Sequence, residues 1–212
     1  MNTDDLIAAL AADNDTKATP LRRSFAVDVA LGFTASAAFF FAFLGLRKTF
    51  FASLDDPRFL FKFVFTATMA ASGLALALRL ARPGAETGAA GRAVWLAPAL
   101  LVAACGVELA TVPADQWFAR MIGQNAIHCL ILVPFMALAP LAGLLLALRN
   151  GAPTDPHRAG AAAAFAASGL SATLYAMSCP DDSPFFLAVW YMLGTAIVVA
   201  VGWLAGGRLL RW

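Results

Sequence analysis

Long apolar stretches separated by short polar ones make up most of the chain. An α-helix rises 1.5 Å per residue, so about 20 apolar residues suffice to cross the hydrocarbon core of a bilayer. The pattern predicts an all-α fold, an integral membrane bundle of six transmembrane helices with short connections. The expected spans cover residues 24–46, 60–81, 93–113, 127–148, 159–179 and 185–206.

The composition supports a chain embedded in lipid. Of 212 residues, 61% are hydrophobic and 13% are charged, whereas a soluble domain has about 45–50% apolar and about 25% charged residues. Basic residues stand at the ends of the apolar stretches and form no stripe along one face. We therefore expect contact with the lipid bilayer and no direct binding of nucleic acid.

The placement of basic residues also predicts an orientation. About two thirds of the 15 Lys and Arg residues fall on the side of the bundle that holds both termini. The positive-inside rule then places the N- and C-termini in the cytoplasm. The turn after the fifth apolar stretch, "PDDSP", contains no basic residue and is expected on the outer side.

The polar start of the chain forms a unit of its own, and we divide the chain into an N-terminal cytoplasmic segment, 1–23, and a transmembrane domain, 24–212. The segment begins with acidic residues and has no apolar core before residue 24, unlike a cleavable signal peptide. Residues 2–13, "NTDDLIAALAAD", predict a short amphipathic helix with one apolar face.

That helix is acidic on its polar face, whereas helices that lie on anionic lipid usually carry Lys and Arg there. A groove on a protein partner is therefore favoured over the bilayer surface. The residues expected to contact this partner are Asp4, Asp5, Leu6, Ile7, Leu10 and Asp13.

Two of the three cysteines are placed to lie at the same depth. Thr154 lies in the short loop between the fourth and fifth spans. Cys129 comes 25 residues before Thr154, and Cys179 comes 25 residues after it. In an antiparallel helical pair, residues equally far from the turn lie at the same height. Whether the side chains touch depends on the rotation of the helices, and a disulfide requires Cα atoms within about 7 Å.

Metal-binding side chains accompany this cysteine pair. His128 precedes Cys129, and Asp181 and Asp182 follow Cys179. Thiolate, imidazole and carboxylate are ligands of zinc and similar ions, so transient binding of a thiophilic metal is one interpretation, with no constitutive cofactor expected. The alternative is packing by buried cysteines and an ordinary turn, in which an aspartate caps the next helix and Pro184 opens it.

Two carboxylates inside the spans form a possible intramembrane polar site. Glu108 lies in the third span and Asp28 in the first, and charges at such positions usually have a role. For Glu108, a structural partner such as Arg120 and a ligand role beside Cys105 both remain open. Lys62 lies near the end of a span, where its side chain can extend to the interface.

Taken together, the sequence resembles the NrsF-type anti-sigma factors, which are six-span bacterial inner-membrane proteins. The resemblance rests on "TDDLIAALAAD" at the start, "HCL" at the fourth span, "RNGAP" after it, "CPDDSPFFLAVWY" at the fifth turn and "GRLLRW" at the end. Ser178 departs from the family, where histidine is common before the second cysteine.

The resemblance implies a membrane anchor without enzymatic activity. Its N-terminal segment would hold an extracytoplasmic-function sigma factor inactive in the cytoplasm. A periplasmic heavy metal or oxidant would act on Cys129 and Cys179 to release that factor.

Two other classes of protein remain open at this point. A small metal or solute transporter would use Glu108, Cys105 and proline kinks in the third and fourth spans. A membrane thiol redox protein would cycle Cys129 and Cys179 between reduced and oxidised forms. Deletion of residues 1–15 should abolish sigma-factor repression but spare transport or redox activity.

Overall fold

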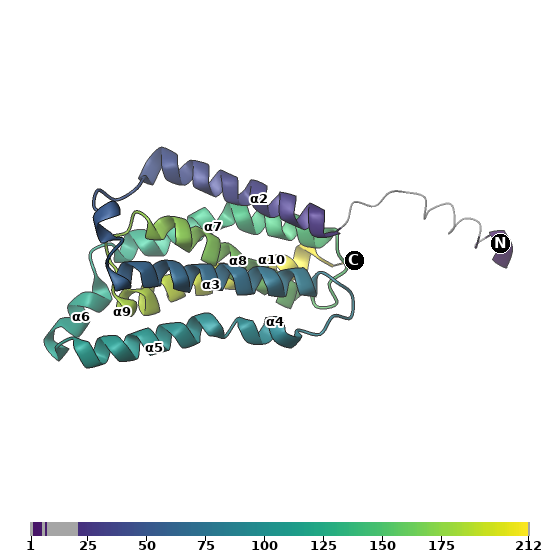
Figure 1. The fold of residues 1–212 in the computed structure, drawn as a ribbon. Helices are drawn as coiled ribbons and strands as arrows, with labels where there is room; N and C mark the ends of the chain where they lie inside the picture. The colour runs from purple at the N-terminus through teal and green to yellow at the C-terminus, as the bar shows by residue number, and fades with distance from the viewer. Residues whose placement is uncertain (1, 6, 8–20, 212) are drawn as a thin grey trace.

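The computed structural model describes residues 2–5, 7 and 21–211, and within these ranges it contains helices and loops but no strand. Six helical segments are long and apolar enough to cross a membrane, which confirms the predicted fold class (Figure 1). Their bounds are Leu21–Leu44, Pro57–Leu80, Gly88–Thr111, Ala126–Arg149, Pro156–Ala176 and Pro184–Leu209.

Several of these spans are built from more than one element. Among the described residues, the order is α2 (Leu21–Phe39), η1 (Phe40–Leu44), η2 (Phe51–Ser53), α3 (Pro57–Leu80), α4 (Gly88–Ala93), α5 (Leu96–Thr111), α6 (Ala114–Ile122), α7 (Ala126–Arg149), α8 (Pro156–Ala176), α9 (Pro184–Phe186), η3 (Leu187–Tyr191) and α10 (Met192–Leu209). The segments η1 and η3 are π-helical turns, and the short helix α6 was not predicted from the sequence.

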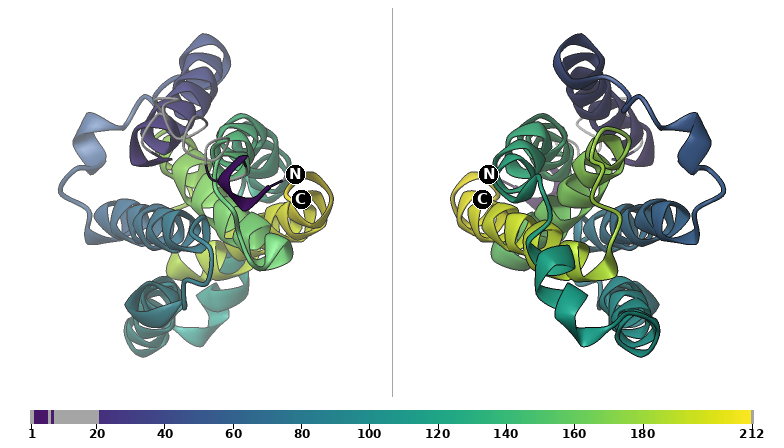
Figure 2. Two further views of the ribbon diagram at one scale, coloured as in Figure 1. Left: turned by 90° about the vertical axis from the view of Figure 1, so that its right-hand side faces the viewer. Right: turned by 90° about the vertical axis from the view of Figure 1, so that its left-hand side faces the viewer.

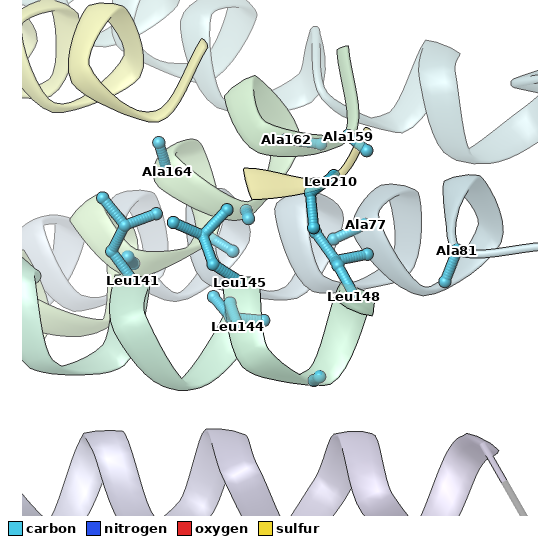
Figure 3. Close-up of a cluster of buried hydrophobic side chains, with 14 of the residues drawn as sticks. Ala77, Ala81, Leu141, Leu144, Leu145, Leu148, Ala159, Ala162, Ala164 and Leu210 are labelled. Carbon is cyan, nitrogen blue, oxygen red and sulfur yellow. The ribbon is translucent and has the colours of Figure 1, made fainter. Parts of the chain in front are cut away.

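Helix α8 occupies the centre of the bundle, where it packs against α3, α7 and α10 (Figures 1 and 2). Helix α2 packs mainly on α7 and helix α5 mainly on α3, so these two lie at the periphery. The alanines of α8 and the leucines of α7 form the largest buried cluster, which includes Leu144, Leu148 and Leu210 (Figure 3).

Small residues let α8 and α10 approach closely. A methyl group added at Gly206 would lie 2.8 Å from the Cα atom of Gly160, and one at Gly202 would lie 2.6 Å from the Gly160 carbonyl oxygen. No side chain other than hydrogen fits at these positions. The close packing that the sequence indicated for these two spans is therefore present.

A proline in α7 is matched by a serine in α2. Pro140 has no N–H group, so the carbonyl of Met136 loses its helical donor. The Ser36 hydroxyl donates a hydrogen bond to that carbonyl at 3.0 Å. This contact satisfies a polar group that would otherwise be buried without a partner, and it fixes α2 against α7.

The bundle has two ends that differ in chemistry. We call the end formed by residues 45–56, 112–125 and 177–183 the cysteine end, and the opposite end, where α2 begins and α10 ends, the termini end (Figure 1). The cysteine end also contains η2 and the short helix α6.

Part of the predicted N-terminal helix lies within the described residues. Thr3–Asp5 and Ile7 are helical, and the Asp5 carboxylate accepts a hydrogen bond from the Asn2 backbone N–H at 3.2 Å. Asp4, Asp5 and Ile7 are exposed. The other residues expected to contact a partner, Leu6, Leu10 and Asp13, lie outside the described residues.

Candidate functional site

Cys129 and Cys179 lie in one buried cluster at the cysteine end of the bundle. Cys129 is on the first turn of α7 and is 0% exposed, and Cys179 follows α8 and is 2% exposed. Both thiols are free and share the cluster with Tyr175 and Tyr191. The equal spacing of the two cysteines from the α7–α8 loop predicted that they lie at the same depth, and the structure adds that they share one buried cluster.

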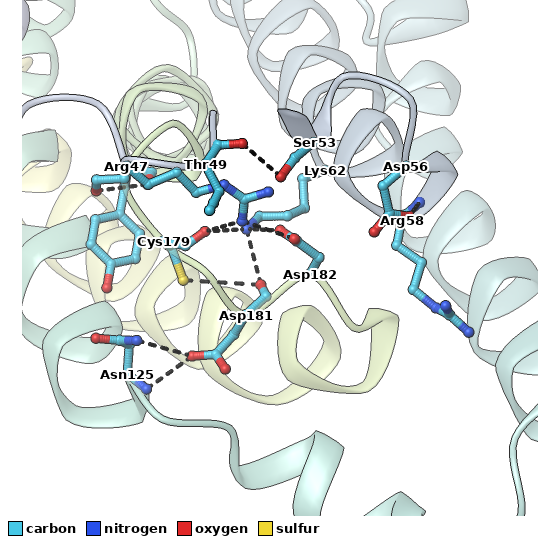
Figure 4. Close-up of polar contacts among 12 residues, drawn as sticks. Arg47, Thr49, Ser53, Asp56, Arg58, Lys62, Asn125, Cys179, Asp181 and Asp182 are labelled. Atoms are coloured by element: carbon cyan, nitrogen blue, oxygen red, sulfur yellow. Dashed lines mark hydrogen bonds and ion pairs between the residues drawn. The ribbon is translucent and has the colours of Figure 1, made fainter. Parts of the chain in front are cut away.

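A fully buried lysine holds the loop that carries Cys179. The Lys62 ammonium donates hydrogen bonds to the Cys179 carbonyl at 2.9 Å, the Asp181 carbonyl at 2.9 Å and Asp182 Oδ1 at 2.7 Å (Figure 4). Lys62 is 0% exposed, so its ammonium reaches the loop at the end of the bundle but is shielded from solvent there. The loop oxygens replace water as ligands of the charge, and all three ammonium protons are used.

Arg47, which follows η1, ties the same loop to the end of the first span. Its backbone N–H donates to the Met177 carbonyl at 3.1 Å, and its Nη1 donates to the Cys179 carbonyl at 3.2 Å. Nη1 also lies 2.8 Å from Asp182 Oδ2. The segment that follows the first span is thus bound directly to the residues around Cys179 (Figure 4).

Asp181 connects this loop to the start of α7. Its carboxylate accepts hydrogen bonds from the backbone N–H groups of Gln124 at 3.0 Å and Asn125 at 2.9 Å. Gly123 precedes them with a φ of 61°, and a Cβ atom there would lie 2.8 Å from Asp181 Cγ. Asp181 thereby links the Cys179 loop to the helix that carries Cys129.

The other side chains that the sequence suggested as metal ligands do not join the two thiols in the buried cluster. Asp181 and Asp182 are bound to protein donors, and His128 is exposed while its neighbour Cys129 is buried. Ser183, not an aspartate, caps the next helix, which Pro184 opens as expected. Within the described ranges, no group of three or more His, Cys, Asp or Glu side chains is placed to hold a metal.

The electrostatic surroundings keep Cys179 protonated. Burial raises the pKa of this thiol, and the charges of Asp181 and Asp182 raise it further, while Lys62 and a hydrogen bond with Asp181 lower it. The net effect is a raised pKa, so the thiol is neutral at physiological pH. In this state Cys179 Sγ lies 3.9 Å from the Asp181 carbonyl oxygen, to which it donates.

Glu108 is paired with two arginines. Its side chain is 4% exposed, and its oxygens lie 2.9 Å from Arg58 Nε and 3.0 Å from Arg120 Nη1. Of the two interpretations for Glu108, the structural partner Arg120 is therefore present, and Arg58 was not anticipated. Cys105 Sγ lies 3.6 Å from the Pro184 carbonyl and borders the cysteine cluster.

Asp28 is remote from this end of the bundle. It lies in the second turn of α2, near the termini end, and accepts a hydrogen bond from Ser24 at 3.3 Å. Glu108 and Asp28 thus belong to opposite ends of the bundle and do not form one intramembrane polar site.

Sequence reasoning missed four residues of the site, namely Arg47, Lys62, Tyr175 and Tyr191. One clue was available, because Arg47 and Lys62 are basic residues on the side of the bundle that holds few of them. The "PDDSP" turn on that same side carries two aspartates and no basic residue. Because the basic residues Arg47 and Lys62 and the two aspartates lie at the same end of the bundle, ion pairs between them could have been predicted.

Comparison with known proteins identifies similar chains along the whole length. Residues 10–212 match the NrsF family, which is described as a negative regulator of sigma F. The chain is 36% identical over 219 residues to the anti-sigma-F factor NrsF of Caulobacter vibrioides, and 31% identical over 213 residues to the probable anti-sigma-F factor NrsF of Azospira oryzae. Both alignments cover 100% of each chain. No solved structure matches this chain.

Proposed function

Because this chain belongs to the NrsF family of negative regulators of sigma F, we propose that it is a membrane-bound anti-sigma factor whose target is an extracytoplasmic-function sigma factor. The full-length similarity to proteins named anti-sigma-F factor is the observation that carries this proposal. The family role is regulatory and not catalytic. Six candidate membrane spans supply the anchor.

The proposed location is the bacterial inner membrane, with both termini in the cytoplasm and the cysteine end in the periplasm. The distribution of Lys and Arg supports this orientation. It leaves residues 1–23 beside the transcription machinery and the two thiols in the compartment where metals and oxidants arrive.

The N-terminal segment is the proposed sigma-factor ligand. Ile7 is 59% exposed, and Asp4 and Asp5 are exposed beside it. An exposed apolar side chain such as that of Ile7 can bind in an apolar groove on a partner protein. Leu6 and Leu10 complete the apolar face that the sequence pattern predicts.

We expect the double variant Leu6→Ala, Leu10→Ala to release the sigma factor without a signal. Burial of each leucine should stabilise the complex by about 1.5–3 kcal/mol, so loss of both should weaken it severely. The measurement is co-purification of the sigma factor with the tagged membrane protein, together with a sigma-dependent reporter. Asn14→Ala, a polar position in the same segment, is the matched control. Unchanged co-purification in the double variant would show that this segment is not the docking element.

The thiol pair is the proposed sensor. A thiophilic metal or a disulfide would join Cys129 on α7 to Cys179 after α8 and alter the loop between residues 177 and 183. Arg47 and Lys62 hold that loop against the end of the first span and the start of α3. Because α2 leads back to residues 1–23, these contacts give the signal a physical route to the sigma factor.

Cys129→Ser and Cys179→Ser should each abolish induction by cadmium, chromate or peroxide while repression persists. Moving a complex from mostly bound to mostly free requires a bias of about 5 kcal/mol, which a metal–thiolate site or a disulfide can supply. The sigma-dependent reporter is read with and without each compound, and Cys105→Ser is the control. Normal induction in both single variants would refute the sensor, and loss in Cys105→Ser alone would relocate it to α5.

A further inference from the structure

A groove between α3 and α5 opens on the outer surface of the bundle and has a volume of about 550 Å³. The α5 residues that line it recur every three or four positions, so they form one stripe along the helix. They are Leu100, Ala103, Ala104, Val107, Glu108 and Thr111. Residues 56–58, Phe61 and Pro184 complete the lining. The groove is open to the surroundings, because Leu100 is 37% exposed and Val107 is 63% exposed.

The length of this groove matches one leaflet of a bilayer. Leu100 and Thr111 are 11 residues apart, which corresponds to about 16 Å along a helix. The hydrocarbon core of a bilayer is about 30 Å thick, so one leaflet contributes about 15 Å. Thr111 ends α5 at the cysteine end. The groove therefore has room for an acyl chain of the leaflet on that side.

Arg58 lies at the polar end of the groove and uses only part of its guanidinium. Its Nε donates a hydrogen bond to Glu108 Oε2 at 2.9 Å, and its side chain is 40% exposed. In Figure 4 the guanidinium points away from the contacts around Cys179. Among the described residues, Nη1 and Nη2 of Arg58 have no hydrogen-bond partner. Glu108 thus orients a guanidinium whose two outer nitrogens remain free, and such a pair fits two oxygens of a phosphate.

Asp56 adds a negative charge to the same rim. It caps α3, and its Oδ1 accepts a hydrogen bond from the Arg58 backbone N–H at 2.8 Å. Among the described residues, no donor is bound to Oδ2. The rim therefore offers a cation for a phosphate and an anion for an ammonium group. A helix from a second copy of the chain would bury these two charges without supplying partners for them.

We propose that this groove binds a zwitterionic phospholipid with an ethanolamine head group, from the leaflet at the cysteine end. One acyl chain lies along the α5 stripe, Arg58 binds the phosphate, and Asp56 accepts a hydrogen bond from the ammonium group. The lipid fills the gap between the peripheral helix α5 and the start of α3. This site does not depend on the proposed sensing function.

Native mass spectrometry of the full-length protein tests this proposal, because it counts both bound lipids and protein copies. The protein in detergent is mixed with equal amounts of phosphatidylethanolamine, phosphatidylcholine and phosphatidylglycerol. We expect one phosphatidylethanolamine to be retained in preference to the other two. Ala103→Phe fills the groove from an exposed position, so the retained lipid should fall several-fold while the melting temperature stays the same. Val102→Phe, at a 72% exposed position on the opposite face of α5, is the matched control and should retain the lipid.

Two variants at the rim test the head group. Arg58→Lys keeps a positive charge beside Glu108 but loses the paired N–H groups. Affinity should therefore fall roughly threefold to tenfold, the value of about one hydrogen bond. Asp56→Asn keeps a good helix cap, and it should abolish the preference for ethanolamine over choline head groups.

Equal lipid retention in Ala103→Phe and Val102→Phe would overturn the proposal. So would retention of all three lipids to the same extent by the parent protein. A dimer that Ala103→Phe dissociates without loss of lipid would instead assign the groove to a second copy of the chain.

Discussion

Asp182 neutralises two basic side chains at once. One of its oxygens lies 2.7 Å from the Lys62 ammonium and the other 2.8 Å from the Arg47 guanidinium. All three side chains are shielded from solvent, with side-chain exposures of 15%, 0% and 8%. A charged side chain that is shielded from water is stable only when an opposite charge lies beside it. Removal of Asp182 would therefore leave the charges of Lys62 and Arg47 uncompensated.

We therefore expect Asp182→Asn to destabilise the protein strongly. The loss of a partner from a buried pair costs about 3–5 kcal/mol. Asp155→Asn is a suitable control, because the Asp155–Arg158 pair is exposed and asparagine also caps helices well. Thermal unfolding of both variants in detergent measures the difference. Equal melting temperatures would show that the buried charges are not held by Asp182.

Separation along the chain determined which ion pairs the sequence could reveal. Glu108 and Arg120 are 12 residues apart at the same end of one span, so their pairing was a natural expectation. Lys62 and Asp182 are 120 residues apart, with Lys62 in the second span and Asp182 in the turn between the fifth and sixth spans. Their contact depends on the lateral order of the helices in the bundle, which hydropathy does not encode.

At the level of elements, α8 and α10 depend on glycines at their contact. We expect Gly202→Val to push these helices apart, because the added side chain meets the Gly160 carbonyl and the Ala164 side chain. Overpacking of this kind costs about 1–3 kcal/mol, and backbone neighbours cannot move aside easily.

The matched control is Gly106→Val in α5, where no atom lies within 4 Å of an added Cβ. Both variants make the same change inside a helix, so their difference in melting temperature reports packing alone. A loss of stability at Gly106 as large as that at Gly202 would contradict the close α8–α10 contact.

Hydropathy placed the starts of two spans at residues 60 and 159, whereas α3 and α8 begin three residues earlier, at Pro57 and Pro156, where polar caps mark the boundary. Asp56 and Asp155 each cap a helix that begins with proline, at α3 and α8. The π-helical turns η1 and η3 leave no trace in hydropathy, because they change the backbone register inside an apolar run. Helix α6 has only 9 residues, which is too short to register as a span.

For the whole molecule, hydropathy predicts the number of spans but not which one is central. The span Pro156–Ala176 is rich in alanine, glycine and serine and is the least apolar of the six. It is nevertheless the most buried, with 78% of its most apolar 18-residue stretch inside the bundle. Lipid selects for large apolar side chains, while close helix contacts select for small ones. Small-residue content is therefore the better guide to the central helix.

The orientation of the whole bundle can be tested by labelling single introduced cysteines in intact cells. Asp115→Cys lies on the exposed surface of α6 at the cysteine end, and Glu86→Cys lies in an exposed loop at the termini end. A membrane-impermeant maleimide should label Asp115→Cys in intact cells and Glu86→Cys only after lysis. The unsubstituted protein serves as the background control. The reverse pattern would place the thiol pair in the cytoplasm and exclude a periplasmic sensor.

The carboxylates beside Cys179 already have hydrogen-bond and ion-pair partners, which affects the metal cations that could bind at this end of the protein. Asp181 is held by backbone N–H groups, and Asp182 is held by Lys62 and Arg47. Magnesium and calcium are hard ions that require several oxygen ligands, so they would have to break these contacts in order to bind. Soft ions require only the sulfur atoms. In the proposed sensor, the hydrogen bonds that shape the loop would therefore also disfavour the binding of magnesium and calcium.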